Sequence, residues 1–375
     1  MAAPEWSQPP GPTALYHERA FLTMTASPAQ PPDDKLGSDF AKLSRSVKRA
    51  GLLQRRYTYY AVRITINALL LVAGAVAFVL LGDSWWQLFT AVFFAVMFTQ
   101  SAFIGHDAGH RQILNTRRGN NLVGQVHSTI TGISYEWWVG KHNQHHANPN
   151  HEEEDPDIEI AALAFSHEQS HTKRGLLRWV AKYQAFLFFP MLLAEAVMLR
   201  IRSVQAVLRR EVKSVKLEAG LLTAHVLGYL VAVFLVLSPG KAVVFLIVHQ
   251  GLMGVYLGCS FAPNHKGMPI LAEGEKLDYL RKQVLTSRNV IGGRGVDFLL
   301  GGLNYQIEHH LFPGMPRPNL RRAQPLIREF CTQRDISYSQ CGLLYSYAEV
   351  LRHLHAVGTP LRRPEPVPPN AHTGT

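Results

Sequence analysis

The stretch "HDAGH" at residues 106 to 110 places two histidines four residues apart at the end of an apolar run, Trp85 to Ile104. Two further stretches, "HNQHH" at 142 to 146 and "QIEHH" at 306 to 310, use similar spacing. Side chains three and four residues apart share one face of a helix. Each stretch therefore predicts a helix that presents imidazole groups on one side, which is typical of a metal site.

Four apolar runs have the length needed to cross a hydrocarbon core of about 30 Å. They are Ala61 to Leu81, Trp85 to Ile104, Leu217 to Leu237 and Ala242 to Ala262. Only "GDS" at 82 to 84 and "SPGK" at 238 to 241 separate the members of each pair, so we expect two hairpins with short outer turns. All three histidine stretches then share one side of the membrane.

The distribution of basic residues predicts the orientation in the bilayer. The net charge is +11, and basic residues gather before the first run: Lys42, Arg45, Lys48, Arg49, Arg55, Arg56 and Arg63. This positive-inside pattern predicts cytoplasmic termini and a cytoplasmic active site, and we expect a bacterial plasma membrane. No recognition motif accompanies the charge, so nucleic acid is not an expected partner. The three scattered cysteines suggest neither a disulfide framework nor a zinc ribbon.

The rest of the chain predicts helices at the membrane surface and two tails. Apolar residues between Leu122 and Trp137 recur at helical spacing, which indicates an amphipathic interfacial helix. Tyr183 to Ile201 is apolar but has basic residues on both flanks, so we expect one helix lying in the membrane plane. The fold class is thus an all-α integral membrane protein with a cytoplasmic helical cap. We expect a disordered Pro-rich tail at 1–38, the membrane domain at 39–345, and a helix end with a second Pro-rich tail at 346–375.

Grouping of the histidines defines the candidate ligands. His265 follows the fourth apolar run directly and joins the three stretches. Eight imidazoles and one amide are too many for a single ion, so two ions of a redox metal are expected, although spacing alone leaves iron, zinc, copper and nickel open. The candidate ligands are His106, His110, His142, His145, His146, His265, His309 and His310, with Gln306 binding directly or through water.

The other histidines have different expected roles. His249 lies about 24 Å from His265 along a helix and cannot share its centre. His225, inside an apolar run, is expected to pack or to line a cavity. Four more lack the box spacing and are expected at the interface or in solvent: His127, His151, His167 and His171.

These motifs resemble the three histidine boxes of membrane fatty acid desaturases. H-x-x-x-H, H-x-x-H-H and Q-x-x-H-H occur here in that order, and the resemblance covers about residues 39 to 345. Gln306 at the start of the third box is similar to front-end and related desaturases of acyl-lipid or acyl-CoA substrates. The resemblance implies two iron ions held by the box histidines and His265, with O2 as co-substrate and two external electrons.

Neighbouring polar and aromatic residues have candidate supporting roles. Asp107, Asn143 and Glu308 lie inside the boxes and are expected to orient imidazole N–H groups. Asp155 and Asp157, in the acidic run "HEEEDPD", fit that role and ordinary solvation equally well. Trp137 and Trp138 are candidate walls of an acyl tunnel, with anchoring in the membrane interface as the alternative.

The electrons are expected from a separate carrier, either ferredoxin with its reductase or a flavin reductase. No H-P-G-G haem motif, clustered cysteines or complete G-x-G-x-x-G fingerprint occurs in this sequence. The expected docking patch lies just beyond the third box and comprises Arg317, Arg321, Arg322 and Arg328.

Two alternative functions stay open from sequence. A hydroxylase or ketolase of the same superfamily would share the ligands. A metal transporter is less compatible, because transporter sites lie near the bilayer midplane.

Overall fold

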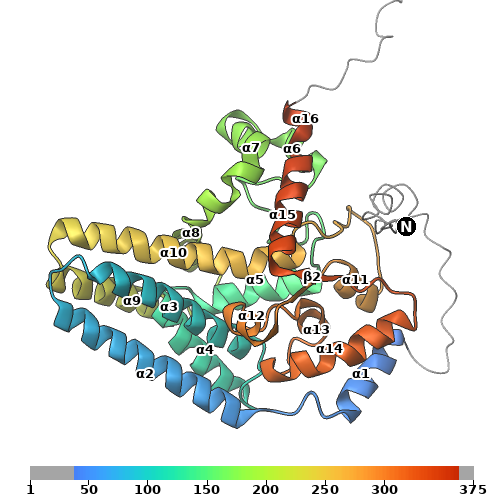
Figure 1. The fold of residues 1–375 in the computed structure, drawn as a ribbon, viewed down its shortest axis with the longest axis horizontal. Coiled ribbons are helices and arrows are strands. Elements are labelled where there is room, and N and C mark those ends of the chain that lie inside the picture. Colours follow the sequence, from blue (N-terminus) through green and yellow to red (C-terminus); the bar gives the residue numbers. More distant parts are fainter. Residues whose placement is uncertain (1–37, 363–375) are drawn as a thin grey trace, which may run out of the picture.

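The computed structural model describes residues 38–362. The first Pro-rich tail falls almost wholly outside these residues, as does the last part of the second. The described chain is mostly helical, with two short strands (Figure 1).

Four helices are long and apolar enough to cross a membrane: α2 (Tyr57–Leu81), α3 (Gln87–Gly109), α9 (Val215–Val236) and α10 (Pro239–His265). They confirm the four predicted spans. Large apolar side chains on them are exposed, for example Leu80 and Leu235, which are 81% and 80% accessible. Such a surface is stable only against lipid.

The two predicted hairpins meet at their outer turns. Asp83, in the turn between α2 and α3, accepts hydrogen bonds from the backbone N–H of Ser238 at 2.9 Å and from Lys241 Nζ at 3.0 Å. Because Ser238 and Lys241 lie at the start of α10, these bonds join the ends of both hairpins.

The expected amphipathic helix is two helices. α4 (Arg117–Thr131) packs along α3, and α5 (Tyr135–Ala147) carries the second histidine box. Gly132 separates them with a φ of 70°, in the left-handed region that favours glycine. The Ser134 side chain then accepts a hydrogen bond from the Trp137 N–H and caps α5. The single-helix prediction missed this break because apolar spacing continues across it.

The segment expected as one in-plane helix is also broken. α7 (Gly175–Leu192) and α8 (Glu195–Leu208) meet at an angle of 85°. The bend packs closely against α10, where a Cβ on Gly254 would lie 2.4 Å from the Leu192 carbonyl oxygen. The single straight helix was therefore wrong, while the placement of this segment in the membrane plane stays a prediction.

Short elements build the helical cap beside the metal-ligand stretches (Figure 1). The cap comprises α1 (Asp39–Arg49), α11 (Tyr279–Leu285), α12 (Gly293–Leu299), α13 (Gln306–Leu311) and α14 (Arg317–Thr332), with β1 (Asn289–Ile291) and β2 (Gln340–Gly342). Three further helices, α6 (His167–Thr172), α15 (Leu343–Val357) and α16 (Thr359–Arg362), pack with α7. The two strands pair in parallel, a feature that the sequence analysis did not predict.

The cap has its own apolar core. Leu43, Leu280, Ile307 and Ile327 are almost fully buried together and join α1, α11, α13 and α14. The expected domain boundary at 345 falls inside α15, which packs against α7 and α10.

Candidate metal centre

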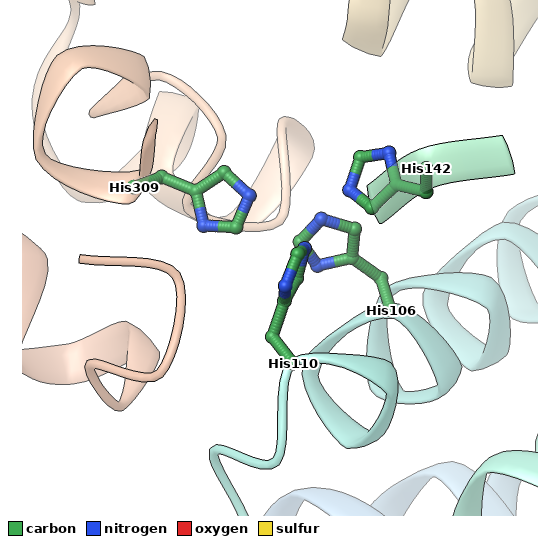
Figure 2. Close-up of side chains that lie close together, drawn as sticks. All are labelled: His106, His110, His142 and His309. Carbon is green, nitrogen blue, oxygen red and sulfur yellow. The ribbon is translucent and has the colours of Figure 1, made fainter. Parts of the chain in front are cut away.

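Four imidazoles converge at one end of the helix bundle. His106 lies in α3, His110 directly follows it, His142 lies in α5 and His309 in α13. One ring nitrogen from each lies within 4.8 Å of the other three. Figure 2 shows the four rings facing a common point. Three separate parts of the chain thus contribute to this first group.

A second group of three imidazoles lies beside the first. It comprises His145, His265 and His310, and the Nε2 atoms of His265 and His310 are 3.0 Å apart. The Gln306 amide lies at the same place, with its Nε2 2.8 Å from His265 Nε2. The chain therefore gathers histidines from α5, α10 and α13 around a second point.

His146 lies between the two groups. Its ring centroid is 4.5 Å from that of His110 in the first group and 4.1 Å from that of His310 in the second. Its Nε2 is also 3.1 Å from His142 Nε2. All nine predicted ligands are thus brought together, and their role as metal ligands stays a prediction.

The chemical state of the rings fits a pair of metal ions. The Nε2 atoms of His106, His110 and His309 are buried and have no hydrogen-bond partner among the described residues. Buried nitrogens without partners cost free energy, and a metal ion would satisfy them. Burial, reinforced by neighbouring imidazoles, holds the pKa of His110, His309 and His310 well below the usual value. A lowered pKa favours the neutral imidazole, which is the form that binds metal.

Hydrogen bonds orient the rings of the second group. His265 Nδ1 donates to the Thr286 carbonyl oxygen at 2.9 Å, and His310 Nδ1 donates to Gln283 Oε1 at 2.9 Å. Gln283 Nε2 in turn donates to the His146 carbonyl oxygen at 2.9 Å, which fixes the amide orientation. Such partners leave Nε2 free for a metal. The sequence analysis missed Gln283 and Thr286, because no spacing links them to the boxes.

Asp155 orients His145. Its Oδ1 is 2.9 Å from His145 Nδ1, and its side chain is buried, so the solvation interpretation was wrong for this residue. Burial lowers the pKa of His145, but the charges of Asp155 and Asp157 outweigh it and raise the pKa. Asp157 also forms an ion pair with Lys141. The Lys141 ammonium group thus balances the Asp157 charge, and Asp155 holds the His145 ring in place.

The predicted orienting residues in the boxes have different surroundings. Asp107 Oδ1 lies 3.3 Å from His106 Nδ1, and its role in orienting that ring stays a prediction. Glu308 instead accepts hydrogen bonds from the Tyr338 hydroxyl at 2.6 Å and from Asn289 Nδ2 at 2.7 Å, and burial raises its pKa to about 7. The expectation that Glu308 orients an imidazole was wrong. Within residues 38–362, no hydrogen bond joins Asn143 to an imidazole either.

Two further expectations are changed by the structure. Arg317 is buried against Asp107 and cannot belong to an exposed docking patch, whereas Arg321, Arg322 and Arg328 are exposed. Trp137 and Trp138 also lie in different surroundings, because neighbouring residues on a helix point in different directions.

Trp138 stacks on the candidate ligand His142, with ring centroids 4.5 Å apart. Trp137 lines an open cleft with Lys141 and Arg202. Their role as tunnel walls stays a prediction.

His249 lies outside the centre, as predicted. Its Nδ1 contacts the Tyr229 hydroxyl at 2.5 Å, between α9 and α10. Two of the histidines expected at the interface are buried, His127 at 4% and His151 at 7% accessibility. Neither belongs to the two groups.

Comparison with known proteins decides the family. Residues 83–342 match the family model described as fatty acid desaturase, and this range includes every candidate ligand. The chain belongs to the fatty acid desaturase family. The recognition made from the three boxes is thereby confirmed, and this desaturase is an oxygen-dependent oxidoreductase of the membrane.

Curated relatives agree with the family. The desaturase is 28% identical to an acyl-lipid (9-3)-desaturase of Physcomitrium patens over 87% of its own length and 64% of the moss protein. It is 26% identical to a Delta(8)-fatty-acid desaturase of Helianthus annuus, over 87% and 74% of the two chains. It is 28% identical to a Delta(6)-fatty-acid desaturase of Caenorhabditis elegans, over 86% and 75%. These relatives are eukaryotic and give no support to the expected bacterial membrane.

Proposed function

We propose that this desaturase introduces a double bond into an acyl chain carried by a lipid or by coenzyme A, using O2 and two external electrons at a pair of iron ions. The observation that carries the proposal is the presence of two adjacent histidine groups with His146 between them. Two ions held this close together would act on one substrate.

Each part of the site has a defined task in this proposal. When bound, iron supplies the oxidising power that removes hydrogen from an unactivated methylene, which side-chain acid and base groups cannot do. His106, His110, His142 and His309 would hold one ion, and His145, His265 and His310 the other, with His146 available to both. Gln306 would contact the second ion directly or through water.

Burial of the site supports oxidation chemistry. His265, His309 and His310 are 6%, 1% and 0% accessible. A closed site limits the entry of water and keeps a reactive species from attacking other groups. The helices α3 and α10 also run from these ligands into the apolar part of the bundle, where an acyl chain would be soluble.

The relatives support an acyl substrate. The names of the moss, sunflower and nematode proteins all specify desaturation of fatty acyl groups. We therefore favour desaturation over hydroxylation or ketone formation, which would use the same ligands. A transporter is disfavoured because both histidine groups lie at one end of α3 and α10 rather than midway along them.

Mass spectrometry of the fatty acids in cells that express the chain tests the reaction type. A desaturase yields a product lighter than its parent by two hydrogen atoms, whereas a hydroxylase yields one heavier by an oxygen atom. The matched control is the variant H142A, which should yield neither product. An oxygenated product that is absent with H142A would replace the desaturase proposal with the hydroxylase.

We also propose that the site faces the cytoplasm and that a separate carrier delivers the electrons there. The exposed arginines 321, 322 and 328 on α14 follow the third box closely and would attract an acidic ferredoxin or flavin reductase. Product formation should then fall as salt rises, and the variant R322Q/R328Q should lose part of this salt dependence. A rate unaffected by salt would contradict docking at this surface.

A further inference from the structure

Arg317, whose side chain pairs with Asp107, also lines a cleft outside the metal centre. This cleft of about 460 Å³ opens between α2, α12 and α14. Four of its lining residues are arginines, namely Arg63, Arg294, Arg317 and Arg321, and Asp297 is its one acidic lining residue. None of the candidate metal ligands lines it.

The charges of the cleft do not cancel. Arg317 pairs with Asp107 at 2.7 Å, and Arg321 pairs with Asp297 at 3.4 Å. Neither Arg63 nor Arg294 makes an ion pair with any carboxylate in the described part of the chain. Two guanidinium groups therefore stay uncompensated, and a phosphodiester group, with one negative charge and two free oxygen atoms, can accept hydrogen bonds from both.

Arg63 is held in place without an acidic partner. Its Nη2 donates to Gln100 Oε1 at 2.7 Å, and its Cζ lies 5.3 Å from the centre of the Phe298 ring. Gln100 is itself fixed by its hydrogen bond to the Tyr256 hydroxyl at 2.8 Å. The remaining donors of this guanidinium group are thus presented to the cleft at little entropic cost.

The cleft lies where apolar and polar surfaces meet. On α2, Val62 and Ile66 flank Arg63 and are each 50% exposed. On α12, Phe298 and Leu299 are 48% and 47% exposed beside Arg294. Arginine at the border of a lipid-facing surface reaches the depth of the phosphate groups of the bilayer.

We propose that this cleft binds the phosphate group of a membrane phospholipid. Arg63 and Arg294 donate hydrogen bonds to the phosphate oxygens, and the acyl chains follow the apolar surfaces of α2 and α12. A soluble phosphate compound shares this chemistry but has no use for the apolar border. The proposal concerns binding alone and is independent of the proposed desaturation.

Arg317, which forms one wall of the cleft, is closely packed. Its side chain passes so close to Gly302 that a Cβ there would lie 2.5 Å from Arg317 Cγ, and Gly302 also has a φ of 82°. Glycine is therefore required at this position on two grounds. Arg317 also contacts Asp107, which in turn contacts His106. These two side chains therefore connect the cleft to a candidate metal ligand.

Native mass spectrometry of the full chain in detergent micelles tests the proposal. The probes are phosphatidylglycerol and a diacylglycerol with the same acyl chains. We expect a phosphatidylglycerol adduct that diacylglycerol does not form. R294Q changes an exposed side chain and should weaken this adduct without loss of folding, and R63Q/R294Q should weaken it about tenfold.

The matched control is R322Q/R328Q, which removes the same charge from exposed positions on α14 outside the cleft. It should bind phosphatidylglycerol like the wild type. Equal adducts in R63Q/R294Q and in the control would overturn the proposal. The second arm of the experiment uses coenzyme A and inorganic phosphate as probes. If R294Q weakens binding of either probe but leaves the lipid adduct unchanged, the cleft binds a soluble phosphate compound instead.

Discussion

Arg317 Nη2 lies 2.7 Å from Asp107 Oδ2, and both side chains are buried. Asp107 also contacts His106 Nδ1 at 3.3 Å, while Arg317 Nη2 donates to the Phe103 carbonyl oxygen at 2.7 Å. Burial lowers the pKa of Arg317, but the Asp107 charge outweighs it and raises the pKa. The cap helix α14 thus fixes the first histidine box through one buried ion pair.

Removal of Arg317 should destabilise the protein strongly. R317M leaves the Asp107 charge buried without a partner, at a cost of about 3–5 kcal/mol. A thermal melt in detergent should show a clear fall in melting temperature. D107N/R317M should recover part of it, because no buried charge is left. R322M, at an exposed position on the same helix, is the control, and an R317M melt that matches this control would refute the role of the pair.

Asp155 should set the metal affinity of the second group. D155N removes the charge that holds His145 Nδ1, and loss of such a partner typically lowers metal affinity about 10–100-fold. Competition with a chelator, followed by metal analysis, measures the change. E154Q alters an exposed neighbour and should behave like the wild type. Equal metal retention in D155N and E154Q would show that His145 needs no orienting carboxylate.

The Tyr338 hydroxyl should stabilise the third box through Glu308. Y338F removes the donor to Glu308 Oε1, which lies 2.6 Å from that hydroxyl, and leaves a buried acceptor unsatisfied. The expected loss is about 1–3 kcal/mol in the free energy of unfolding. Y57F, at a half-exposed position on α2, is the control. If both variants unfold at the same denaturant concentration, Glu308 does not depend on this hydrogen bond.

Much of the site could be predicted from local spacing, because His106 with His110, and His142 with His145 and His146, each lie within one or two helical turns. The supporting contacts could not. Arg317 belongs to a basic run that is typical of a surface, and only the fold brings its side chain, at the start of α14, to Asp107 in α3.

The fold was predictable to a similar extent. The four spans are long uniform apolar runs, so their composition is sufficient. The break at Gly132 is a local feature, a glycine with a left-handed φ followed by the Ser134 cap, whereas the bend after Leu192 lies against Gly254 of α10. Apolar periodicity reports neither feature.

Cysteine labelling tests the placement of the bent pair α7 and α8. In a background without native cysteines, T172C and R210C lie at exposed positions on either side of the pair. If the pair does not cross the bilayer, an impermeant reagent should label both from the same side. G240C, at the start of α10, is the control for the other side. Labelling of T172C and R210C from opposite sides would establish a fifth span.

The number of iron ions per chain tests the two-metal centre most directly. Protein made in iron-replete, zinc-poor medium should contain two iron ions, and H265A should retain one, because His265 belongs only to the second group. The exposed control variant H167A should keep both. One iron ion in the wild type, or zinc alone in a fully active preparation, would contradict the account.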